Sequence, residues 1–188
     1  MANSSVSIAN RGLQILGSER IESLTQDHPN ARSMNAAYEP VRNALLRRYV
    51  WNFAKKRASV AADAAVTTWG DLNRYTLPND FVRLIRNDES GMRLDWQIEG
   101  RFIVTADAAP LEFKYLARVT DPAEFDDSFV ELLAHELALK TCKEITGNSV
   151  SQDLKDQHTD AFNAAKQSNA FEEDAVQPLD DDWINARL

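Results

Sequence analysis

The segment spanning residues 27–57, DHPNARSMNAAYEPVRNALLRRYVWNFAKKR, carries the longest helical periodicity in the first half of the chain. Apolar side chains recur along it at about every 3.6 residues, which places them on one face of a helix. These positions are Ala31, Met34, Tyr38, Val41, Leu45 and Tyr49. Asp27 is expected to cap the helix, with Pro29 in its first turn. Because the stripe keeps its phase across Pro40, we expect one kinked helix and not two separate ones.

The hydrophobic period changes to two between residues 57 and 119, which predicts a β-rich segment. Short apolar runs alternate there with turn-forming residues. The expected strands cover residues 75–80, where the strand closes in a turn, and residues 81–86, 94–99, 102–104 and 111–115. Because the connections between consecutive strands are short, we expect hairpin neighbours and therefore an antiparallel meander.

Helical signals surround this β-rich segment on both sides. Residues 4–16 suit a short helix that ends at Gly17. The run Asp-Pro-Ala-Glu at 121–124 predicts a helical turn, and Asp126 is expected to cap the long apolar helix that follows. That helix is apolar around most of its circumference, so it should be the most buried element. A final amphipathic helix is expected over residues 150–171.

These patterns predict an α+β protein that is predominantly helical. The expected architecture is a helix bundle with a small antiparallel β-sheet or meander inserted between its N-terminal and C-terminal helices. Residues 1–56 and 120–171 would form the helical domain, and residues 57–119 the β-rich insertion. Residues 172–188 would form an acidic C-terminal docking tail. A chain of 188 residues is long enough for one sizeable core with an appendage.

The sequence contains no constellation that is typical of catalysis. Cys142 is its only cysteine, so neither a disulfide framework nor a cysteine-based zinc site is expected. His135-Glu136 resembles the start of a zinc-binding helix, but Leu139 stands where the second histidine would be. A glycine-rich phosphate loop and a nucleophile elbow are both missing from the sequence. We therefore expect no enzyme, no metal and no cofactor. Apolar runs fall short of the roughly 18 residues of a membrane span, so no membrane partner is expected.

The formal charge of -8 argues against a protein that coats nucleic acid nonspecifically. Six basic residues nevertheless follow one another with no acid between them: Arg42, Arg47, Arg48, Lys55, Lys56 and Arg57. One interpretation is a solvated face or a contact to an acidic subunit. The other is a basic surface that meets passing DNA. Arg47 points away from the apolar stripe, so it is a better candidate for an external contact than Arg48, which flanks the stripe.

The C-terminal tail combines acidic and apolar residues. From Phe171 onward the sequence holds six acidic residues and one arginine. The apolar Trp183, Ile184 and Leu188 follow at its end. An acidic linker with an apolar tip is typical of a segment that docks on a partner. The alternative is that Trp183 folds back onto its own subunit, and both interpretations are kept.

Short motifs are distributed along nearly the whole chain. They are Leu16-Gly17, Ile21-x-Ser23-Leu24, Asn30-Ala31-Arg32, Trp51-Asn52-Phe53-Ala54, Tyr75-x-Leu77-Pro78-x-Asp80, Trp96-x-Ile98-Glu99-Gly100 and Tyr115 followed by Asp121-Pro122. In this order they resemble the head-to-tail adaptor proteins of tailed phages, called tail tubular protein A in short-tailed phages. The resemblance implies a helical part packed beside a small β part.

The resemblance also implies a structural virion protein and not an enzyme. About a dozen copies, a homododecamer, would form a ring that joins the portal protein to the tail nozzle protein. Packaged double-stranded DNA would pass through its centre and contact it nonspecifically. The expected location is the neck or tail of the virion, after synthesis in the host bacterial cytoplasm. Two alternatives are kept: a tail-associated peptidoglycan hydrolase, whose carboxylates could come from anywhere in the chain, and a small α+β binding module unrelated to phages.

Overall fold

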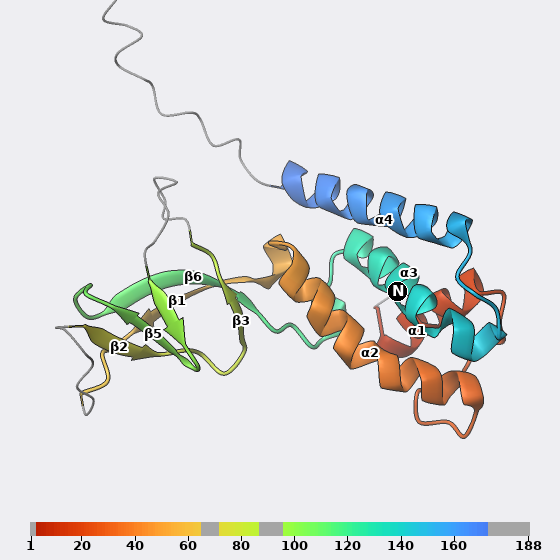
Figure 1. Ribbon diagram of the computed structural model, residues 1–188, viewed down its shortest axis with the longest axis horizontal. Coiled ribbons are helices and arrows are strands. Elements are labelled where there is room, and N and C mark those ends of the chain that lie inside the picture. The colour runs from red at the N-terminus through yellow and green to blue at the C-terminus, as the bar shows by residue number, and fades with distance from the viewer. Residues whose placement is uncertain (1–2, 65–71, 87–95, 173–188) are drawn as a thin grey trace, which may run out of the picture.

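A computed structural model describes residues 3–64, 72–86 and 96–172. Its helical part and its β part lie side by side along the longest axis (Figure 1). The elements are α1 (Ser5–Ile15), α2 (Pro29–Arg48), the 3₁₀ turn η1 (Asn52–Ala54), β1 (Lys55–Val60), β2 (Asn73–Thr76), β3 (Phe81–Leu84), β4 (Gln97–Glu99), β5 (Phe102–Thr105), β6 (Leu111–Ala117), the 3₁₀ turn η2 (Pro122–Glu124), α3 (Asp127–Thr146) and α4 (Gln152–Phe171). The predicted α+β class, with strands inserted between N-terminal and C-terminal helices, is confirmed.

Helix α2 runs through Pro40 without interruption, so the prediction of a single helix across this residue is confirmed. Its cap, however, is His28 and not Asp27. The His28 Nδ1 atom accepts a hydrogen bond from the backbone N–H of Asn30 at 3.2 Å. Pro29 occupies the first helical position, which leaves the residue directly before it as the cap. The Asp27 carboxylate instead pairs with the Arg32 guanidinium at 2.5 Å.

Helix α3 is the centre of the helical part. It lies between α2 and α4 and also contacts α1 (Figure 1). Asp126 caps its start, as predicted, by accepting a hydrogen bond from the Ser128 N–H at 2.9 Å. Gly147 ends it in the left-handed conformation, with φ at 72°. Its buried side chains lie on several faces: Phe129, Leu132, Leu133, Ala134, His135, Leu137, Ala138, Thr141 and Cys142. This burial explains the apolar residues around most of its circumference.

The corner between α2 and β1 is built around Trp51, which is 1% exposed. Its indole Nε1 donates a hydrogen bond to the Leu45 carbonyl at 2.9 Å. The rings of Tyr49 and Phe129 meet the indole edge-on, each at a centroid distance of 5.1 Å. These contacts anchor the end of α2 on the core.

The C-terminal end of α4 is tied to the same corner. The Asn169 side-chain oxygen accepts a hydrogen bond from the Asn52 N–H at 2.7 Å, and the Asn52 amide donates to the Asn169 carbonyl at 2.7 Å. Asn169 Nδ2 also donates to the Val50 carbonyl at 3.2 Å. The point at which the acidic tail begins is therefore held beside the end of α2.

The strands form two antiparallel three-stranded sheets, with the orders β1-β6-β3 and β2-β5-β4. The antiparallel pairing is confirmed, but among the described strands only β4 and β5 pair with a direct neighbour in sequence. A simple meander is therefore not formed. Tyr75, Ile103, Phe113 and Trp96 come from both halves of this arrangement and share one apolar core. The central position of β6 between β1 and β3 is not revealed by short loops alone.

Candidate interaction surface

The predicted run of basic residues does not form one surface, and Arg42 shows this most clearly. Arg42 is 6% exposed, so its place on an external basic surface is wrong. Its guanidinium donates to the Asn43 side-chain oxygen at 3.0 Å and lies 3.6 Å from the Glu39 carboxylate. Arg42 and Leu46 lie one turn apart and are both buried, because the buried face of α2 is wider than the predicted apolar stripe.

Arg48 is directed at the neighbouring helices. Its Nη1 atom lies 3.9 Å from Oε2 of Glu136 on α3, and its guanidinium lies 4.3 Å from the ring centroid of Phe162 on α4. His158 on α4 also approaches Glu136, with Nε2 at 2.5 Å from the carboxylate. Arg48 therefore joins α2 to the two C-terminal helices.

Lys56 forms an ion pair within the β part. Its Nζ donates to the Asp80 carboxylate at 2.8 Å, and the Tyr115 hydroxyl donates to the other carboxylate oxygen at 2.9 Å. Burial alone would raise the pKa of Asp80, but the hydrogen bonds from Lys56 and Tyr115 lower it below its ordinary value. Burial, and then the hydrogen bond to Asp80, raise the pKa of Tyr115 to about 12. The other two predicted residues lie on β1, with Lys55 half-buried and Arg57 exposed.

Arg47 lies in a groove of about 410 Å³ between the end of α2 and the β part. We call it the arginine groove. Three further arginines line it, Arg83, Arg86 and Arg101, none of which was predicted as a site residue. The remaining lining residues are Leu77, Phe81, Val82, Leu84, Ile98 and Gly100. Four arginines and five large apolar residues thus line the groove, and one of the apolar residues, Ile98, is 38% exposed.

The four guanidinium groups of the arginine groove have no carboxylate partner among the residues that the structure describes. Arg47 donates to the Val82 carbonyl at 2.7 Å, and Arg101 donates to the Pro78 carbonyl at 2.7 Å. These bonds orient two of the cations without neutralising them. Within the described ranges, the side chains of Arg83 and Arg86 make no hydrogen bond or ion pair. Chemically, such a set suits a ligand that carries several carboxylates or phosphates.

Sequence reasoning missed three of the four arginines because they are far apart along the chain. Arg83 lies within β3, Arg86 follows β3, and Arg101 follows the Gly100 turn between β4 and β5. A weak signal exists in Arg83 and Arg86, two arginines in the otherwise apolar run at residues 81–86. That signal does not indicate which helix lies opposite.

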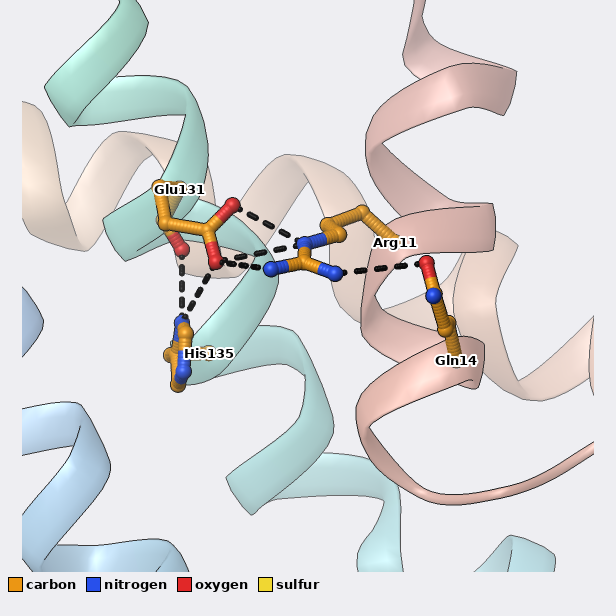
Figure 2. A network of polar contacts seen from close by, with 4 residues as sticks. All are labelled: Arg11, Gln14, Glu131 and His135. Carbon is orange, nitrogen blue, oxygen red and sulfur yellow. Dashed lines mark hydrogen bonds and ion pairs between the residues drawn. The ribbon is translucent and has the colours of Figure 1, made fainter.

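A separate polar network joins α1 to α3 (Figure 2). The Arg11 guanidinium donates to both carboxylate oxygens of Glu131, with its shortest bond at 2.7 Å, and a further nitrogen donates to Gln14 at 3.3 Å. His135 Nδ1 lies 3.0 Å from the Glu131 carbonyl oxygen. The hydrogen bond from Arg11 lowers the pKa of Glu131, which keeps this carboxylate ionised and engaged. The network therefore fastens two helices together.

We expect acid to weaken the fold through this network. Because the folded-state pKa of Glu131 lies below its ordinary value of 4.5, the ionised carboxylate stabilises the fold above that pH. This stabilisation is lost as the pH falls through the folded-state pKa. Urea unfolding at a series of pH values should show a steeper loss of stability for the wild type than for Glu131→Gln. Glu112→Gln, at an exposed position of β6, is the control and should keep the wild-type slope. Identical slopes for the wild type and Glu131→Gln would contradict the prediction.

The described residues include no group of three or more His, Cys, Asp or Glu side chains that could hold a metal ion. None of the helices in the described part of the chain combines the length and apolarity needed to cross a membrane. The predicted docking residues Trp183, Ile184 and Leu188 lie outside the described residues. Comparisons with protein families and with curated proteins found no match.

Proposed function

We propose that this chain is a structural virion protein, a head-to-tail adaptor of the tail tubular protein A type. About a dozen copies form a ring between the portal protein and the tail nozzle protein, in the neck of the particle. DNA passes through the centre of this ring. The protein carries no catalytic role in this proposal.

The main support is where the motif residues of the resemblance lie in the fold. Trp51 fills the corner between the two parts, and Asn52 binds the end of α4. Asp80 accepts hydrogen bonds from Lys56 and Tyr115, which come from the two paired strands β1 and β6. Residues that recur in a family with one architecture would be expected at such contacts between structural elements, because each contact depends on specific side chains.

Contact with DNA in the proposed ring would be electrostatic and independent of base sequence. Arg47 is exposed and has no carboxylate partner among the described residues, and Arg57 is also exposed. Arg48 and Lys56 are exposed but contact Glu136 and Asp80, and Arg42 is buried. The contribution of the original basic run to a channel would therefore come from Arg47 and Arg57. Arg42 is not part of the proposed DNA contact.

The proposal is tested by assembly of this chain on the portal protein of the phage or prophage genome that encodes it. Mass photometry and electron microscopy of the mixture should show a portal ring that gains about a dozen 21.2 kDa subunits at one end. A portal protein from an unrelated phage is the control and should gain none. A chain that stays monomeric and leaves its cognate portal bare would refute the adaptor function.

A further inference from the structure

We propose that the arginine groove is the docking site for residues 173–188 of the same polypeptide. The groove is lined by four arginines, Arg47, Arg83, Arg86 and Arg101. The proposed occupant is the acidic, apolar-tipped end of the chain. This inference does not depend on the proposed adaptor function.

Charge is the first argument for this occupant. Four arginines without a described carboxylate partner gather in one groove of a protein whose net charge is -8. Such a concentration of positive charge attracts an anionic ligand, and the guanidinium fork matches a carboxylate in a bidentate arrangement. Residues 173–188 supply carboxylates at Glu173, Asp174, Asp180, Asp181 and Asp182. The chain therefore carries its own ligand of complementary charge.

The apolar residues that line the groove favour a peptide over other polyanions as its occupant. Ile98 is 38% exposed, and Phe81 and Val82 are half-buried beside it. In the tail, three consecutive aspartates are followed directly by Trp183 and Ile184. A peptide of this kind can pair with the arginines and cover the exposed isoleucine at the same time. A phosphate backbone would satisfy only the charges.

Tethering favours the same subunit over a second copy. Asn169 is bonded to Val50 and Asn52, and Glu172 accepts a hydrogen bond from Asn52 at 3.3 Å. These contacts place the start of the tail beside the end of α2, the helix that also carries Arg47. An extended chain of this length reaches about 50 Å, so the groove is within range. Intramolecular attachment raises the local concentration of the tail to about the millimolar range.

The test traps the tail by a disulfide in the full-length chain. Ile98→Cys and Ile184→Cys are combined in a Cys142→Ala background and incubated with oxidised glutathione, the disulfide form, at low protein concentration. We expect about tenfold more intramolecular disulfide than with the control pair Glu99→Cys and Ile184→Cys, because charged hydrogen bonds hold the tail on the groove side of β4. Adding Arg83→Glu with Arg86→Glu should lower the yield about tenfold, and Arg83→Gln with Arg86→Gln should lower it less.

Several results would overturn the inference. One is a yield at position 98 that equals the control. Another is a product that consists of covalent dimers, which would assign the groove to the tail of a second copy. A third is duplex DNA binding that requires Arg83 and Arg86, combined with a disulfide yield that charge reversal leaves unchanged. Far-UV circular dichroism establishes that each variant is folded, and the glutamine pair serves if the glutamate pair does not fold.

Discussion

Trp51→Ala is expected to lower the free energy of unfolding by about 4 kcal/mol, a large part of the stability of a domain of this size. The indole is 1% exposed and fills the corner where α2, η1 and α3 meet. Its removal leaves a cavity, strips the edge-on contacts with Tyr49 and Phe129, and frees the Leu45 carbonyl from its hydrogen bond. Urea unfolding followed by far-UV circular dichroism measures the loss.

Two matched variants separate the contributions of Trp51. Trp51→Phe keeps an aromatic ring but removes the Nε1 donor, so we expect a smaller loss of about 1–2 kcal/mol. Phe171→Ala removes an aromatic side chain that is 80% exposed and should change stability by less than about 0.5 kcal/mol. A loss of less than about 1 kcal/mol for Trp51→Ala would mean that this corner does not anchor the helix.

Gly12→Val is expected to cost about 2 kcal/mol and to lower Tm by about 6 °C. Gly12 lies where α1 approaches α3. A Cβ atom at this position would lie 3.1 Å from the Ala134 carbonyl oxygen, 3.4 Å from Met34 Cε and 3.6 Å from Leu137 Cβ. The closest of these atoms belongs to the backbone of α3, which cannot rotate away. A branched side chain must therefore push the two helices apart. Differential scanning calorimetry measures the change.

The controls for Gly12→Val change the size and the place of the added side chain. Gly12→Ala adds only the Cβ atom and gains about 1 kcal/mol of helix propensity, so its Tm should lie between the Tm values of the wild type and Gly12→Val. Ala36→Val places the same branched side chain on the exposed face of α2 and should lower Tm by no more than about 2 °C. A Tm for Gly12→Val at or above the wild-type value would show that α1 does not pack closely on α3.

The helices and the fold class could be predicted because their signals are local. The stripe from Ala31 to Tyr49 repeats with the helical period, and the cap at Asp126 and the stop at Gly147 act on the nearest turn of backbone. The change of period between residues 57 and 119 likewise indicated the β-rich segment. Each of these features depends on residues within a few positions of one another, so the linear order of the chain is sufficient to locate them.

The candidate site depended on contacts between distant segments. Arg47, Arg83 and Arg101 belong to a helix, a strand and the residue after a hairpin turn, and they meet because β3 pairs with β6 and the end of α2 lies against β3. The basic residues between positions 42 and 57, in contrast, lie in different environments. Arg42 is buried, Arg48 contacts Glu136 on α3, and Lys56 pairs with Asp80 in the β part. Side-chain periodicity determines which residues share a face of one element, but the packing of the apolar faces against each other determines which of those faces meet.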